Sequence, residues 1–84
     1  MAGEKRVGVV AILIGDRKAA VGKVNELLSE FGDLVVGRMG VPYRERRVSV
    51  IALLVDGTTD EIGALTGRLG AVPGVKTRSL LLTQ

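Results

Sequence analysis

One short segment, residues 37–47, holds the side chains best suited to binding an anion or a partner protein. It reads GRMGVPYRERR, and its formal charge of +3 (four arginines minus one glutamate) equals that of the whole 84-residue chain. Two glycines, a proline and a tyrosine are typical of a shaped loop. Its candidate effector-binding or interface residues are Gly37, Arg38, Met39, Gly40, Pro42 and Tyr43, and its basic patch is Arg44, Arg46 and Arg47.

The arginines of this segment are compatible with three roles. They could form a solvated hairpin loop that has no partner. They could form a phosphate-binding surface, whose affinity would fall steeply as the salt concentration rises. They could also pair with acidic residues of a neighbouring subunit, while Met39 and Tyr43 pack beneath them.

A second candidate site is the junction at Gly15 and Asp16, between a predicted strand and a predicted helix. The first backbone amides of a helix lack partners within the helix, so an anion can bind there. Ordinary turn chemistry explains the same two residues equally well.

Catalytic and metal-binding chemistry have little support in the composition. The chain contains no cysteine and no histidine, which removes thiolate ligands, imidazole ligands and the usual near-neutral acid or base. Its acidic residues lie mostly at helix starts, on helix faces or in turns, where capping and surface charge explain them. We therefore predict a binding protein, not an enzyme, with no catalytic residues, no metal site and no cofactor.

Four strands are predicted from the hydrophobic pattern. Residues 7–14 and 47–55 are apolar on both alternating faces, which is typical of central strands covered on both sides. Residues 34–41 form a strand that its glycines place at an edge or a bend, and a turn follows at Pro42 and Tyr43. Residues 75–83 form the last strand.

Two helices are predicted between these strands. The first, at 17–31, has Asp16 as its N-cap and Gly32 as a C-terminal glycine cap. The second, at 59–72, begins with Thr58 and Glu61 at the spacing of a capping box. The glycines on this helix are Gly63, Gly67 and Gly70. We expect either close backbone packing against a neighbour or an irregular helix end to explain them, and a ligand that approaches the backbone is the alternative.

The order strand, helix, strand, strand, helix, strand predicts an α+β, ferredoxin-like domain spanning residues 1–84. In this fold two helices cover one face of a four-stranded antiparallel sheet. The other face would expose one alternating apolar set, drawn from Val7, Val9, Leu13, Ile51, Leu53, Val55 or their neighbours. Because an exposed apolar sheet marks an interface, we predict a homo-oligomer, either a dimer or a tetramer.

The N-terminal apolar run predicts a cytoplasmic protein without membrane association. The run ends at Ile14, is too short to span a bilayer and lacks an export cleavage pattern.

Several motifs together resemble the family of iron-only hydrogenase system regulators. They are Gly37–Tyr43, Asp56–Thr58, Asp60–Ile62, Ala64–Gly70 and Pro73–Val75, so the resemblance covers nearly the whole chain. It implies an ACT-like subunit similar to the C-terminal domain of the nickel-responsive repressor, an oligomer and a regulatory role.

The chain departs from that wider group in two ways and from the family pattern in one. The nickel-responsive repressor binds its metal through histidine and cysteine, and both are absent here. That repressor also has a DNA-binding domain before the effector domain, whereas here the first predicted strand starts by Val7. The family pattern has a glycine in the turn after Glu45, where this chain has Arg46 and Arg47.

Two functions follow as hypotheses. The first is a non-enzymatic, oligomeric regulatory module that binds a small effector or a partner protein and acts in transcription of a hydrogenase system. The second is direct binding of nucleic acid by the arginine-rich hairpin loops.

Overall fold

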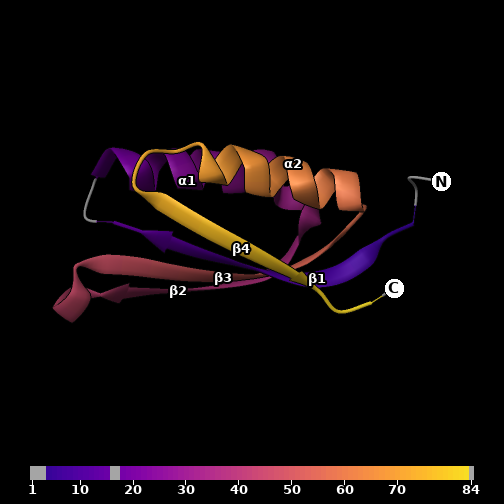
Figure 1. Cartoon of the computed structure of the whole chain (residues 1–84), viewed down its shortest axis with the longest axis horizontal. Coiled ribbons are helices and arrows are strands. Elements are labelled where there is room, and N and C mark those ends of the chain that lie inside the picture. Colours follow the sequence, from indigo (N-terminus) through magenta and orange to yellow (C-terminus); the bar gives the residue numbers. More distant parts are fainter. Residues whose placement is uncertain (1–3, 16–17, 84) are drawn as a thin grey trace.

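The computed structural model describes residues 4–15 and 18–83. Four strands form one antiparallel sheet in the order β2-β3-β1-β4, and both helices lie on the same side of it (Figure 1). The elements are β1 (Arg6–Ile14), α1 (Lys18–Glu30), β2 (Val35–Tyr43), β3 (Val48–Gly57), α2 (Thr59–Gly70) and β4 (Val75–Leu81), with short 3-10 helices η1 (Gly32–Leu34) and η2 (Arg44–Arg46). This arrangement confirms the predicted ferredoxin-like fold, with β1 and β3 at the centre and β2 at an edge.

The core lies between the sheet and the two helices. Each helix contributes one stripe of buried residues, as its period predicts, and each central strand contributes every second side chain. The buried residues of these elements are Val10, Ile12, Ile14, Ala20, Val24, Leu27, Leu28, Ile51, Leu53, Val55, Ile62, Leu65 and Leu69.

The opposite face of the sheet has no covering layer in the described chain (Figure 1). Since side chains alternate along a strand, Val7, Val9 and Leu13 point to this face, as predicted. The structure assigns it Val50, Ala52 and Leu54 of β3, because Ile51, Leu53 and Val55 point to the helices. We call this surface the open face.

A capping box starts α2, as the sequence predicts. The Thr58 hydroxyl accepts a hydrogen bond from the Glu61 amide at 3.1 Å, and the Thr58 amide donates to Glu61 Oε1 at 2.9 Å. The hydrogen bond from the Thr58 backbone is the main cause that lowers the pKa of Glu61, with the Thr58 side chain next. The predicted N-cap of α1, Asp16, lies outside the described residues.

The structure corrects two local predictions. Gly32 is not a helix cap, because α1 ends at Glu30 and Gly32 begins η1, which brings Leu34 into the core. Pro42 and Tyr43 are not a turn: β2 continues through both, and the turn is formed by η2 and Arg47. Pro42 is tolerated because β2 is an edge strand.

Close packing against a neighbour does not explain the first two glycines of α2. Gly63 and Gly67 are exposed, and a Cβ atom added to either would meet nothing within 4 Å outside the helix. Gly70 has a neighbour at ordinary contact distance, since its added Cβ would lie 3.6 Å from Thr77 Cγ2.

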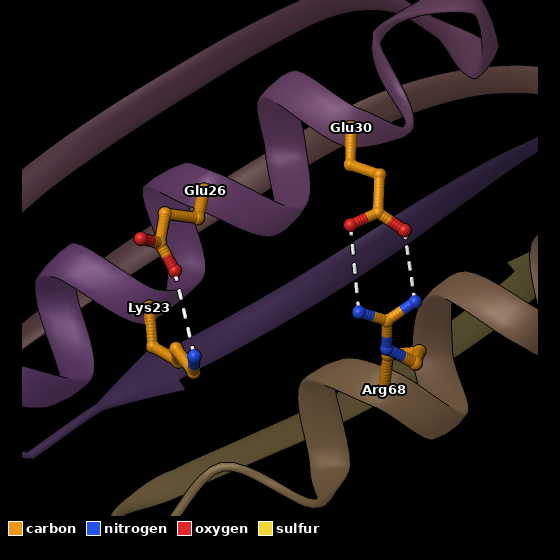
Figure 2. Close-up of polar contacts among 4 residues, drawn as sticks. All are labelled: Lys23, Glu26, Glu30 and Arg68. Carbon is orange, nitrogen blue, oxygen red and sulfur yellow. Dashed lines mark hydrogen bonds and ion pairs between the residues drawn. The ribbon is translucent and has the colours of Figure 1, made fainter.

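Charged contacts join the outer surfaces of the helices (Figure 2). The Arg68 guanidinium of α2 donates to both carboxylate oxygens of Glu30 in α1, at 2.8 and 3.4 Å. The same guanidinium lies 5.8 Å from the centre of the Phe31 ring. A second ion pair, Lys23 to Glu26 at 3.5 Å, stays within α1. Neither described helix is long and apolar enough to cross a membrane.

Candidate functional site

Strand alternation divides the candidate segment between two surfaces. Arg38, Gly40 and Pro42 pair with Leu53, Ile51 and Ser49, and they lie on the side of the sheet that faces α1. The residues on the open face are Gly37, Met39, Val41 and Tyr43. The predicted effector and interface residues of this segment therefore lie on opposite sides of the sheet and not on one surface.

A basic pocket lies where the start of α1 meets the β2–β3 hairpin, and both are at the same end of the molecule (Figure 1). Its volume is about 320 Å³. The residues that line it are Gly15, Lys18, Val21, Pro42, Arg44, Arg47, Val48 and Ser49. Gly15, Pro42, Arg44 and Arg47 were candidates from the sequence and come together here. Arg46 is not among the lining residues.

The hairpin turn places Arg44 and Arg47 at the same pocket. The Arg47 amide donates to the Arg44 carbonyl at 3.1 Å, which closes η2. Arg47 has left-handed backbone angles, with φ 55° and ψ 40°. A non-glycine residue in this conformation costs about 1–2 kcal/mol. The chain thus accepts backbone strain at a position that supplies a cation to the pocket.

Gly15 and Lys18, at the end of β1 and the start of α1, form the opposite wall of the pocket. The Gly15 amide donates to the Gly74 carbonyl at 2.9 Å, which fixes the end of β1 against the turn before β4. Lys18, in the first turn of α1, supplies the third cation. The sequence-based prediction missed Lys18 and Val21, although both lie within the first turns of the predicted helix.

The pocket is electropositive. Among its described lining residues three are basic and none is acidic. The ion pairs found in the described part of the chain, Lys23–Glu26 and Arg68–Glu30, involve none of these three cations. An anion bound among these three cations would reduce their mutual repulsion.

An apolar groove continues from the basic pocket along α1. Its volume is about 180 Å³, and it shares Val21, Pro42 and Ser49 with the pocket. The residues that complete its lining are Ile14, Asn25, Arg38, Gly40, Val41 and Ile51. Arg38 Nη2 donates to Asn25 Oδ1 across it at 3.5 Å, a long contact. Arg38 and Gly40 thus belong with the basic pocket, whereas Met39 and Tyr43 do not.

The acidic residues form no site of their own. Within residues 4–15 and 18–83, no three acidic side chains gather as a metal site would require. Glu61, whose pKa is lowered, is a helix cap at the opposite end of β3 from the basic pocket.

Comparisons with known proteins identify the family of this chain. A family model named TM1266-like and described as "Iron-only hydrogenase system regulator, putative" matches residues 6–79. The solved structure of an uncharacterized Thermotoga maritima protein, TM1266, is similar over 95% of this chain and 100% of that chain, at 39% identity and a TM-score of 0.93. No curated protein matches the chain.

Two further solved structures share the fold at lower identity. The ACT domain of a Chlorobium tepidum GTP pyrophosphokinase is 17% identical, covering 90% of this chain and 99% of that one, at a TM-score of 0.77. The C-terminal domain of the MgtC protein from Mycobacterium tuberculosis is 17% identical, covering 94% and 89%, at a TM-score of 0.67. The fold is thus ACT-like. Since the family model matches most of the chain and TM1266 is 39% identical over 95% of it, the chain belongs to the TM1266-like family of iron-only hydrogenase system regulators.

Proposed function

We propose that this chain is a cytoplasmic, single-domain regulatory module, not an enzyme, that assembles as a homo-oligomer and binds a small anionic effector in the basic pocket. One observation carries the proposal: Lys18 from α1 and Arg44 and Arg47 from the β2–β3 hairpin surround the same pocket. The family description supports a role in regulating an iron-only hydrogenase system, and we propose that this regulation acts on transcription.

The chemistry of the pocket selects the effector. Arginine binds carboxylate and phosphate groups through paired hydrogen bonds, so two arginines and a lysine favour a carboxylate or a phosphate. The volume of about 320 Å³ suits a small molecule. The adjoining groove, with Val21 and Ile51 in its lining, accommodates a short apolar group attached to that anion.

Regulation follows from the two elements that the anion would join. A bound anion bridges the start of α1 and the hairpin turn, and thereby stabilises one arrangement of the hairpin over others. The last residues of β2 belong to the same hairpin and carry Val41 and Tyr43 onto the open face. Effector binding on one side of the sheet would thus change the surface presented on the other side.

The experiment is a thermal-shift screen of carboxylates, phosphate monoesters and nucleotides, followed by calorimetry of any hit. Lys18→Ala and Arg44→Ala should each weaken binding roughly 10- to 100-fold, because each removes a charge-assisted hydrogen bond worth about 1.5–3 kcal/mol. Arg46→Ala is the matched control, since Arg46 lies in the same turn but not in the pocket. Equal binding by all four proteins, or no hit in the panel, would reject the proposal.

Direct binding of nucleic acid is the second candidate. It is favoured by the exposure of Arg44, Arg46 and Arg47 together at the hairpin tip. Duplex binding at 50 and 200 mM salt distinguishes the two functions. A phosphate-backbone contact predicts that affinity falls with salt and that Arg46→Ala weakens it as much as Arg44→Ala. Salt-independent binding, or no binding, would exclude this candidate.

A further inference from the structure

The open face carries rows of side chains that run across the sheet at right angles to the strands. Strand pairing places Met39, Ala52, Ala11 and Arg78 in one row. The next row on the same face is Gly37, Leu54, Val9 and Leu80. We call them the alanine row and the leucine row.

Side-chain size changes in opposite directions along the two rows: where one row has a large side chain, the other has a small one. At the β2 edge, Met39 of the alanine row is 66% exposed, whereas Gly37 of the leucine row has no side chain. On β3 the sizes reverse, because small Ala52 lies beside Leu54, which is 42% exposed. On β1, Ala11 likewise lies beside the larger Val9.

These steps in size make a hollow between the rows. Its volume is about 330 Å³, and its lining residues are Val9, Gly37, Arg38, Met39, Ala52, Leu53 and Leu54. A Cβ atom added to Gly37 would meet nothing within 4 Å, so the hollow is open above the glycine. A side chain from outside the molecule can therefore enter it without moving the strands.

We propose that a second copy of this chain packs its open face onto this one, about a two-fold axis that crosses the strands between the alanine row and the leucine row. The axis places each row over the other row of the partner copy. Met39 then enters the partner's space above Gly37, and Leu54 enters the space above the partner's Ala52. The same surface thus supplies both knob and hole, as an interface between identical subunits requires.

The area of the open face supports a second copy of the chain as the partner. Four strands of 7–10 residues form a face of about 30 by 19 Å, given a rise of about 3.4 Å per residue and a strand spacing of about 4.8 Å. Two copies would bury roughly 1,200 Å², the lower bound for a stable, specific interface.

Most of the open face is uncharged, and the proposed axis places its one described carboxylate, Asp56, over the partner's Val50. Along β2, β3 and β1 the described residues of this face are uncharged except Asp56, near the end of β3. The cations Lys76 and Arg78 lie on the outer strand β4. The proposed axis places Arg78 over the partner's Leu80, so that its charged end reaches solvent at the rim and its stem covers an exposed leucine.

This inference specifies the homo-oligomer of the proposed function and does not depend on the effector. The basic pocket lies on the helix side, so the dimer leaves it accessible. Effector binding and dimer formation can consequently be tested separately in the same variants.

The decisive experiment pairs two variants. Ala52→Asp and Leu54→Lys each place a charge on the apolar interface, and native mass spectrometry should find each alone as a monomer while the unaltered chain is a dimer. In a 1:1 mixture, the introduced carboxylate of one chain faces the introduced ammonium group of the other, so heterodimers should form at least tenfold more readily than either homodimer. Circular dichroism checks that both variants are folded, and Ala64→Asp, on the exposed face of α2, should remain a dimer.

The opposing results are equally clear. The interface is wrong if the unaltered chain is a monomer at 100 µM, if either charged variant remains a dimer, or if the mixture stays monomeric. A monomer that binds anionic lipid vesicles through this face would overturn it in favour of a membrane surface. Effector-induced thermal shifts that persist in monomeric Ala52→Asp would leave the ligand proposal intact, whatever the outcome for the interface.

Discussion

Arg47 combines an unfavourable backbone conformation with a place in the basic pocket. Its φ of 55° is costly for arginine and natural for glycine. We predict that Arg47→Gly raises the free energy of unfolding by about 0.5–1 kcal/mol, because relief of strain exceeds the entropy that glycine adds to the unfolded chain. Urea denaturation measures this change, and calorimetry should show weaker anion binding in the same variant.

Arg46→Gly is the control for that prediction. Arg47 is the described non-glycine residue with a positive φ, so glycine at position 46 relieves no such strain and should lower stability by about 0.5 kcal/mol. If both glycine variants lowered stability equally, the left-handed conformation of Arg47 would not be costly, and the trade of stability for binding would be disproved.

Glu61 makes stability depend on pH through the capping box. Its pKa in the folded state lies below the usual value of 4.5, mainly because its carboxylate accepts the Thr58 amide hydrogen bond. A group with a lowered folded-state pKa stabilises the fold above its unfolded-state pKa, and this contribution is lost as the pH falls through the folded-state value. We predict that Glu61→Gln is less stable than the unaltered chain at pH 7 and that this difference disappears as the pH falls through the folded-state pKa of Glu61. Thermal melts of both proteins from pH 7 to pH 3 measure it, and a constant gap would refute the prediction.

At the scale of single elements, a glycine lowers the intrinsic stability of helix α2. Gly63 lies in the exposed interior of this helix, and an added Cβ atom would meet no neighbour. We predict that Gly63→Ala stabilises the protein by about 0.5–1 kcal/mol through helix propensity alone. The contrasting variant is Gly8→Ala on β1, whose Cβ would lie 2.7 Å from the Leu80 carbonyl oxygen and should cost about 1–3 kcal/mol. Chemical denaturation of both variants measures these changes, and a destabilising Gly63→Ala would contradict the prediction.

The elements themselves could be predicted from the sequence because their signals are local. The continuous apolar run of residues 7–14, the stripe of α1 and the spacing of Thr58 and Glu61 each depend on residues within one helix or one strand. Where tertiary contacts decide, prediction failed. Leu34 is buried, and the 3-10 helix η1 that brings it into the core begins at Gly32, so Gly32 does not cap α1. Pairing with β3 keeps Pro42 and Tyr43 in β2.

At the scale of the whole molecule, the candidate site could be predicted only in part. The sequence indicated that Gly15, Arg38, Pro42, Arg44 and Arg47 matter, but it assigned residues 37–43 to one candidate site, although it predicted a strand over 34–41. Because that segment is a strand, successive side chains point to opposite sides of the sheet and serve different surfaces. Lys18 was missed because its place beside the hairpin depends on how α1 packs over the sheet.

The proposed dimer through the open face also predicts how thermal stability should depend on protein concentration. A chain of 84 residues gains stability from a partner that binds only the folded form, and this gain grows with protein concentration. For a dimer of this size we predict that a 100-fold increase in concentration raises the Tm by roughly 5–10 °C. Calorimetric scans at 2 and 200 µM measure the change in the unaltered chain and in Ala52→Asp. The charged variant should melt at the same temperature at both concentrations, because it cannot form the interface. A Tm independent of concentration in the unaltered chain would mean that the open face is exposed in solution, whereas equal concentration dependence in both proteins would assign the oligomer to a different surface.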